Sequence, residues 1–246
     1  MADYINSHIN DETYSFNIPP DERIGIFFPV HGWRPPKLVR QFVSRLHITN
    51  AEKHYCYIIC TAGDTVGKAT NMLKQQLMSC GLRPSLTTSL LMPESYVGLP
   101  FMDVDKPENG KRKKQDAVLR LNTFINDIIQ RRQYTDDITV GKWPRINSEI
   151  IGEIFDRYII SDKPFHVNSH KCIGCGLCAK KCPVEDIICG KGQKPLWKHN
   201  GRCLTCFACY HHCPTNAIQY GHRTKGKGQY YYEKSKCHIT TNANKK

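Results

Sequence analysis

Two runs of cysteines constrain this chain more than any other feature. Within each run the gaps between cysteines are two, two and three residues, and a proline follows the fourth cysteine. The runs are Cys172-Ile-Gly-Cys175-Gly-Leu-Cys178-Ala-Lys-Lys-Cys182-Pro183 and Cys203-Leu-Thr-Cys206-Phe-Ala-Cys209-Tyr-His-His-Cys213-Pro214. The repeat extends beyond the cysteines, because Ile187 follows Cys172 at the same separation at which Ile218 follows Cys203. We therefore expect a structural repeat with a short helix and an apolar lid in each half.

The spacing predicts two [4Fe-4S] clusters and hence single-electron transfer. Two-residue gaps let one tight loop aim three thiolates at one cube, and in such runs the fourth cysteine ligates the other cluster. Each proline after the fourth cysteine redirects the chain, because it cannot continue a helix. The predicted ligands are Cys172, Cys175, Cys178 and Cys213 for the first cluster and Cys203, Cys206, Cys209 and Cys182 for the second.

Zinc is the main alternative for these cysteines. Structural zinc sites typically use two C-x-x-C pairs separated by a longer loop, which fits three regular gaps followed by Cys-Pro poorly. His211 and His212 lie inside the second run, and we expect them on the surface or beside the ligands rather than as ligands. The five remaining cysteines follow no ligand spacing and are interpreted as packed or free thiols; they are Cys56, Cys60, Cys80, Cys189 and Cys237.

The net charge of +13 is concentrated in the C-terminal third. Residues 1–160 carry 20 Lys and Arg against 18 Asp and Glu, whereas residues 161–246 carry 15 against 4. We interpret this basicity as compensation for anionic clusters and as steering of an acidic redox partner, and we do not expect nucleic acid as a partner. No apolar run of membrane-spanning length and no signal peptide are apparent, so a cytoplasmic location is expected.

The first part of the chain alternates strand and helix patterns. Apolar strands are predicted at residues 24–30, 55–61 and 85–92, and amphipathic helices at 35–46 and 68–79. A long helix is predicted at 114–132, with an apolar face of Val118, Leu121, Ile125, Ile128 and Ile129. Buried strands separated by helices predict a parallel, doubly wound α/β sheet.

A further helix, at residues 148–160, has apolar side chains on overlapping turns, and we expect them to be core packing between two halves. They are Ile150, Ile151, Ile154, Phe155 and Tyr158. Because composition changes after Pro164, we place the domain boundary near Asp162, giving domains at 1–161 and 162–246.

The chain resembles the EFR family of ferredoxins, which are fusions, common in anaerobic bacteria, of a flavodoxin-like domain to a C-terminal dicluster ferredoxin. The resemblance rests on residues 25–36, 60–65, 92–96 and 221–230 and on both cysteine runs. It implies an α/β flavodoxin-like domain followed by a small α+β ferredoxin domain. It also implies that loops after the strands converge on an FMN. The implied flavin-contacting residues are His31, Trp33, Thr61, Gly63 and Tyr96, with the two aromatic rings as stacking candidates.

The sequence departs from this family at its N-terminus. Residues 1–23 contain no Ser/Thr/Gly-rich loop of the kind that wraps the FMN phosphate, and Met1 to His8 resembles the end of a missing first helix. Losing two or three charged hydrogen bonds costs on the order of 5 kcal/mol, so this chain is expected to bind FMN weakly or not at all.

These observations predict a low-potential electron carrier whose first half binds FMN or serves as a docking domain. The alternative is a flavin-dependent reductase fed by its own ferredoxin domain. A basic run at Lys111–Lys114 is interpreted as a solvated helix entry rather than a docking patch.

Overall fold

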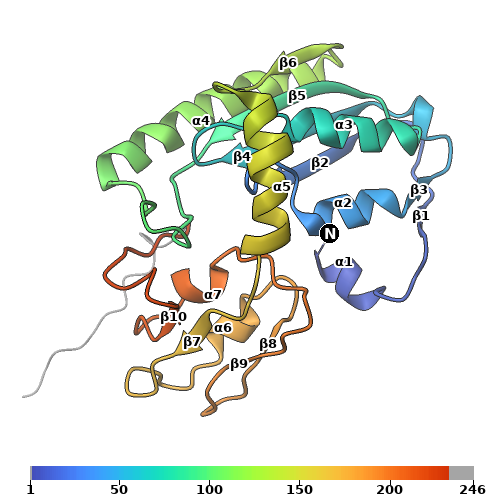
Figure 1. Cartoon of the computed structure of the whole chain (residues 1–246). Coiled ribbons are helices and arrows are strands. Elements are labelled where there is room, and N and C mark those ends of the chain that lie inside the picture. The colour runs from blue at the N-terminus through green and yellow to red at the C-terminus, as the bar shows by residue number, and fades with distance from the viewer. Residues whose placement is uncertain (1, 233–246) are drawn as a thin grey trace, which may run out of the picture.

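The N-terminal half is built on a four-stranded parallel sheet (Figure 1). The computed structural model describes residues 2–232. In the order β2-β4-β5-β6, the strands are Ile24–Pro29, Cys56–Ala62, Pro84–Leu91 and Thr135–Asp137. Every pair in this sheet is parallel, from Ile24 beside Cys56 to Thr88 beside Asp137. The prediction of an α/β domain with a parallel sheet is thereby supported, and β2, β4 and β5 lie within one residue of the predicted strands.

Helices cover both faces of this sheet, which is why β4, one of its two inner strands, is apolar along most of its length. On one face, α2 (Lys37–Ser44) and α3 (Ala69–Ser79) pack Val43, Leu73 and Leu77 against Ile58. On the other face, α4 (Pro107–Ile129) packs Phe124 near Leu86. A strand buried on both faces favours a continuous apolar run over strict alternation.

The apolar face predicted for α4 is only partly right. The helix begins at Pro107, whose fixed φ and missing N–H suit the first turn of a helix. Ala117, Leu121, Phe124 and Ile128 form the stripe that faces the sheet. The other predicted side chains, Val118, Ile125 and Ile129, are exposed, because each stands one position off that stripe.

An aromatic cluster holds the N-terminal segment against the sheet domain. Helix α1 (Ala2–Ser7) presents Tyr4 to Tyr14, and Tyr14 stacks on Phe42 with ring centroids 5.4 Å apart. Tyr14 lies in β1 (Tyr14–Phe16), which pairs with β3 (Leu46–Ile48) in a separate two-stranded parallel sheet. A short 3₁₀ helix, η1 (Ala51–Lys53), leads from β3 to β4.

The C-terminal half repeats its elements with the period of the cysteine runs. β7 (Phe165–Val167), α6 (Leu177–Lys180) and β8 (Ile187–Ile188) are followed by β9 (Leu196–Trp197), α7 (Ala208–His211) and β10 (Ile218–Tyr220). The strands exchange partners between repeats, since β7 pairs antiparallel with β10 and β8 with β9. The two repeats therefore close on each other and share one core.

One helical segment joins the halves and crosses the front of the sheet (Figure 1). It consists of η2 (Ile146–Ile151), α5 (Gly152–Ile154) and η3 (Phe155–Ile159), the first and last in π conformation. We call it the linker helix. The prediction that its apolar side chains are core packing is wrong for most of them, since Ile150, Ile151, Ile154 and Tyr158 are exposed.

The linker helix instead turns small and acidic residues towards the sheet domain. Ser148 and Gly152 are buried, and Asp156 forms ion pairs with Arg34 and with Arg40, the latter at 2.5 Å. The periodicity of apolar residues predicted a helix here correctly but predicted the wrong buried face. The face that packs on the sheet domain is determined by ion pairing and by the close approach of small residues.

A loop of the first half is built into the second half. Val97 is fully buried in the core that contains Phe165 and Phe207. The Lys227 ammonium donates hydrogen bonds to the carbonyls of Val97, at 3.0 Å, Met102, at 2.6 Å, and Leu99. Three donors of one ammonium thus meet three carbonyls, which fixes residues 97–102 to the C-terminal half.

Among the residues that the structure describes, no helix combines the length and the apolar character needed to cross a membrane.

Candidate functional site

The two cysteine runs enclose two cavities in the C-terminal half. The first cavity has a volume of about 320 Å³, counted to its open mouth. Among its lining residues are Cys172, Cys175 and Cys178 of the first run and Cys213 of the second. These are the four side chains that the sequence grouped for a first cluster.

The second cavity has the reciprocal composition and a volume of about 310 Å³. Cys203, Cys206 and Cys209 of the second run line it together with Cys182 of the first. Each cavity therefore takes three cysteines from one loop and one from the far end of the other run.

Left-handed backbone residues shape both loops in the same way. Gly174 and Thr205, equivalent in the repeat, have φ of 64° and 49°, and Gly176 and Phe207 have φ of 72° and 58°. Glycine adopts this region freely, whereas for other residues it costs about 1–2 kcal/mol. That Thr205 and Phe207 keep it anyway indicates that the loop conformation is required in both repeats, because it turns successive thiols towards one cavity.

The fourth cysteine of each run receives a backbone hydrogen bond. The Asp186 N–H donates to Cys182 Sγ and the Ala217 N–H donates to Cys213 Sγ, each at 3.2 Å. In the second loop, the Thr205 N–H also donates to Cys203 Sγ, at 3.4 Å. Such donors stabilise the negative charge of a thiolate and of any metal group bound to it.

Burial raises the pKa of several of these thiols. It raises the pKa of Cys178 and of Cys203 to about 12 and that of Cys209 well above its usual range, because a bare thiolate is poorly solvated there. A bound cationic metal would replace the proton and supply the missing stabilisation, as metal binding to cysteine generally releases protons. The donor set of soft sulfur atoms fits iron or zinc.

The positions of the thiols favour an iron–sulfur cluster over a single zinc ion. Within residues 2–232, no three His, Cys, Asp or Glu side chains converge closely enough to hold a single ion. Zinc requires four ligand atoms at about 2.0–2.3 Å from one point. Thiols spread around the wall of a cavity instead fit a polynuclear cluster, whose iron atoms each meet one cysteine.

The two cavities differ in charge at one pair of equivalent positions. Asp186 occupies the position in the first repeat that Ala217 occupies in the second. Its carboxylate is buried beside that of Asp162, which pairs with His199 Nδ1 at 3.0 Å. Desolvation and the neighbouring Asp162 raise the pKa of Asp186 to about 6. The second cavity therefore has buried acidic groups where the first has a methyl group. The spacing of the cysteines did not predict this difference.

His211 and His212 take different positions. Of the two locations expected for His211, on the surface or beside the ligands, burial excludes the surface, and its Nε2 lies 2.7 Å from the carbonyl oxygen of Ser95 in the other half. His212 is partly exposed and stacks on Tyr231 at 4.2 Å. Neither histidine lines a cysteine cavity.

The five other cysteines separate into three groups. Cys56 and Cys60 are buried in β4, as expected for packed thiols, and Cys80 donates to the Val43 carbonyl at 3.1 Å. Cys237 lies outside the described residues. Cys189, by contrast, lines the first cavity.

The loops expected to border a flavin do converge, but on side chains of the protein. Phe155 of the linker helix packs at Gly32, next to His31, and against the ring of Tyr96 with centroids 5.5 Å apart. Trp33 donates from Nε1 to Thr65 Oγ1 at 3.0 Å and packs on Gly67. Trp33 and Tyr96, the two residues expected to stack on a flavin, therefore contact other residues of the protein instead.

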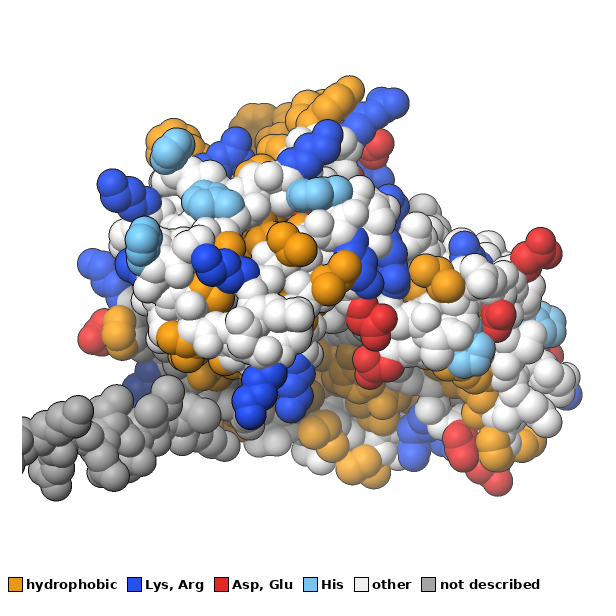
Figure 2. Space-filling view, turned by 90° about the horizontal axis from the view of Figure 1, so that it is seen from below, with side chains coloured by type: hydrophobic (Ala, Val, Ile, Leu, Met, Phe, Trp, Pro, Cys, Tyr) orange, Lys and Arg blue, Asp and Glu red, His pale blue; other side chains and the backbone are white. Residues whose placement is uncertain are grey.

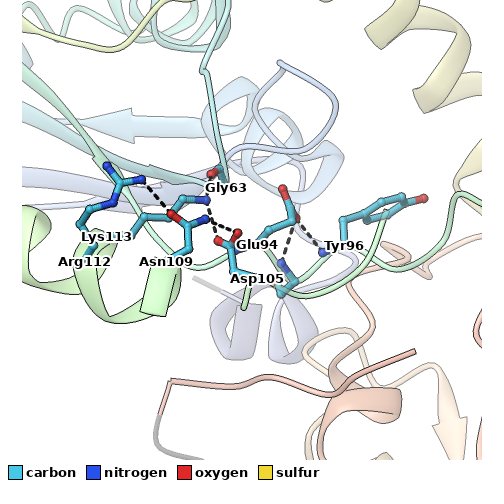
Figure 3. A network of polar contacts seen from close by, with 8 residues as sticks. Gly63, Glu94, Tyr96, Asp105, Asn109, Arg112 and Lys113 are labelled. Atoms are coloured by element: carbon cyan, nitrogen blue, oxygen red, sulfur yellow. Dashed lines mark hydrogen bonds and ion pairs between the residues drawn. The ribbon is translucent and has the colours of Figure 1, made fainter. Parts of the chain in front are cut away.

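A carboxylate occupies the remaining loop (Figure 3). Glu94 Oε1 accepts hydrogen bonds from the N–H groups of Ser95, at 2.9 Å, and Tyr96, at 2.7 Å, and the same carboxylate lies against Gly63. An internal anion therefore takes donors that a flavin or its phosphate would need. Thr61 lies in β4, beside Pro29 of β2, and the residues present do not fit a flavin among these loops.

Lys113 closes the same network from α4. Its ammonium donates to the Gly63 carbonyl at 2.5 Å and pairs with Asp105 at 2.6 Å. The basic run at residues 111–114 was predicted to be solvated. Lys113 is instead bonded to other residues of the fold, so the prediction is only partly right.

The match to known families falls on the first repeat. Residues 165–188, from β7 to β8, match the Fer4 family, a 4Fe-4S binding domain. A comparison with curated proteins found no match. The C-terminal half therefore contains a ferredoxin-type domain, the class of domain that binds a 4Fe-4S cluster and transfers electrons.

Proposed function

We propose that the chain is a low-potential single-electron carrier that holds two [4Fe-4S] clusters, one in each cavity. The observation that carries this proposal is the reciprocal lining of the cavities, three cysteines from one run and the fourth from the other. The proposed ligands are Cys172, Cys175, Cys178 and Cys213 in the first cavity and Cys203, Cys206, Cys209 and Cys182 in the second. Bound clusters would supply one-electron redox chemistry.

Support for a second cluster comes from the repeat, because the family match covers only the first. The second repeat has the same strand and helix order, left-handed residues at the same two loop positions and the same N–H donor to its fourth cysteine. Packing alone does not require a strained loop around a cavity of similar volume. The second repeat therefore supports a second cluster.

We propose an acidic protein as the redox partner. Between residues 161 and 232, Asp162 and Asp186 are buried and Glu185 is the one exposed acidic residue. The exposed basic residues of that stretch are Lys163, Lys171, Lys180, Lys181, Lys191, Lys194, Lys198, Arg223 and Lys225. Viewed from that side, the surface carries scattered blue side chains (Figure 2). The positive electrostatic potential of these side chains accelerates the encounter with an anionic partner.

The partner would dock near the first cavity. Cys175 and Ile173, which line it, are exposed, and Ile173 retains 65% of its accessible surface. Lys171 and Lys180 flank the same loop in sequence. An electron transfer surface of this kind combines an apolar contact over the redox centre with a ring of complementary charge.

For the N-terminal half we propose a docking role with weak FMN binding at most, because Phe155 and Glu94 occupy the loops. Titration of FMN fluorescence with the full chain tests this statement. Sub-micromolar binding would contradict it.

Iron and sulfide analysis after anaerobic reconstitution tests the electron-carrier proposal. Two cubane clusters give about eight iron and eight sulfide per chain. Stoichiometric zinc without acid-labile sulfide would refute it.

Paired variants test which cysteines share a cluster. If ligation is crossed, C182A/C206A removes two ligands of one cluster and keeps about four iron, whereas C182A/C175A damages both clusters. Uncrossed ligation predicts the reverse order of iron contents for these two variants.

A further inference from the structure

The first cavity contains a fifth cysteine. Cys189 follows β8 and lines this cavity with the four proposed ligands of the first cluster. Its backbone carbonyl oxygen is the atom nearest to the position that a Cβ on Gly176 would take, at 3.6 Å, so Cys189 lies next to the first cysteine loop.

The Cys189 thiol lies next to one ligand in particular. Cys189 and Cys178 line the same cavity, and the two thiols are close enough to interact electrostatically. The other contacts of the Cys189 thiol are weak, a donation to the Gln193 carbonyl at 3.3 Å and a longer one to the Gly190 carbonyl at 3.7 Å. Sulfhydryl donors contribute little, so these contacts do not hold the side chain strongly in place.

Among the described residues, the second cavity has no such extra thiol. The repeat places Tyr220 where the first half has Cys189, and Tyr220 is fully buried, with its hydroxyl donating to the Ile159 carbonyl at 3.2 Å. The cysteines that line the second cavity are its four proposed ligands. The repeat thus supplies an internal comparison between a cavity with five thiols and one with four.

We propose that Cys189 is a reserve ligand of the first cluster, able to bind the iron that Cys178 binds. The inference rests on the proposed function, since it requires a cluster in the first cavity. With a cluster bound, the Cys189 thiol would release its proton to solvent and its sulfur would form one Fe–S bond. The Fe–S bond to Cys178 would break, and the released Cys178 thiolate would take up a proton from solvent. The oxidation state of the cluster does not change.

The test compares Cys178→Ala with Cys209→Ala, its equivalent in the second run. With Cys189 available, C178A retains about eight iron per chain, whereas C209A loses its cluster or keeps a three-iron remnant. The double variant C178A/C189A then behaves like C209A, with loss of the first cluster or a three-iron remnant in its place, and the cluster surviving in the second cavity shows that the domain is folded.

Alkylation of the anaerobic, loaded protein with iodoacetamide gives a second readout by mass spectrometry. Cys189 is labelled in the parent chain and protected in C178A, because a metal-bound thiolate does not react. Equal iron loss in C178A and C209A, or labelling of Cys189 in both forms, would overturn the inference. A parent chain that binds no cluster would instead refute the proposed function, so the two failures are distinguishable.

Discussion

Tyr96 of the N-terminal half and Phe207, which stands between two cysteines of the second run, pack edge to face with ring centroids 5.3 Å apart. Phe207 keeps a left-handed backbone and is buried, so its ring is presented by the cysteine loop itself. The pair therefore connects the loops at the strand ends of the sheet with the wall of the second cavity.

Removing the Tyr96 ring should weaken the contact between the halves. We expect Tyr96→Ala to lower the free energy of unfolding by about 1–3 kcal/mol, because the ring also packs on Phe155. Tyr96→Phe should be neutral or slightly stabilising, since the buried hydroxyl has no hydrogen-bond partner among residues 2–232. Urea unfolding of both variants measures the difference, and equal losses would contradict the interpretation.

The stability of the chain should fall in mild acid because of His31. Burial lowers the pKa of this side chain to about 4, against the opposing effect of the Asp156 carboxylate. Between about pH 6.5 and pH 4 the unfolded chain binds a proton that the folded chain does not, so stability decreases as the pH falls through that window. We expect the free energy of unfolding to be about 1–2 kcal/mol lower at pH 5 than at pH 7. This is less than the full pKa difference implies, because His31 is partly exposed.

His31→Gln provides the control for this pH dependence. The variant has no titrating ring, so its unfolding free energy should decrease less between pH 7 and pH 5 than that of the parent chain. Parallel pH profiles for the two proteins would rule out His31 as the cause.

Gly174 and Gly176 should respond differently to a methyl group although both have positive φ. A Cβ at Gly174 would lie 2.8 Å from the backbone of Gly192, whose N–H donates to the Gly174 carbonyl at 2.8 Å. At Gly176 the nearest atom would be 3.6 Å away. We expect Gly174→Ala to lose the iron of the first cavity and Gly176→Ala to retain it at a cost of about 1–2 kcal/mol in stability.

Iron analysis of the reconstituted variants distinguishes the two glycines. Full loading of Gly174→Ala would show that the segment around Gly192 moves freely away from the loop.

Asp186 should lower the reduction potential of the cluster in the second cavity relative to that of the first. A buried negative charge disfavours the addition of an electron nearby, and the equivalent residue Ala217 carries none. Asp186→Asn should therefore shift one midpoint potential upward when the titration is run well above pH 6, the pKa to which burial and Asp162 raise this carboxyl.

Redox titration followed by EPR measures the potentials. Introducing Asp186→Asn into the Cys206→Ala background, where the second cluster is damaged, should abolish most of the shift. A shift of equal size in that background would place the effect on the first cavity and contradict the prediction.

The features that the sequence predicted well are those with a local signal. Cysteine spacing predicted that Cys213 lies beside Cys172, although they are far apart in the chain, and both line the first cavity. That the two cysteines bind one cluster stays a prediction. The strand around Ile58 was predictable because a strand covered on both faces is apolar along most of its length. The edge strand around Ile26 was predictable from its apolar residues alone, although Phe27 is exposed.

The features that were missed depend on packing between distant segments. Apolar periodicity identified a helix near Ile154 but carried no information on which face docks, and that choice follows from Arg34 and Arg40 on other elements. Likewise, Cys189 and Asp186 follow no ligand spacing, and only the closure of the two repeats brings them to the cavities.

The attachment of residues 97–102 to the Lys227 ammonium also has a consequence for synthesis. When the sheet domain has left the ribosome, Val97 still lacks the core in which it is buried, and that core is completed only after Lys227 emerges. The segment before α4 is therefore the last part of the first half to reach its native contacts, and co-translational folding of this protein ends where the two halves meet.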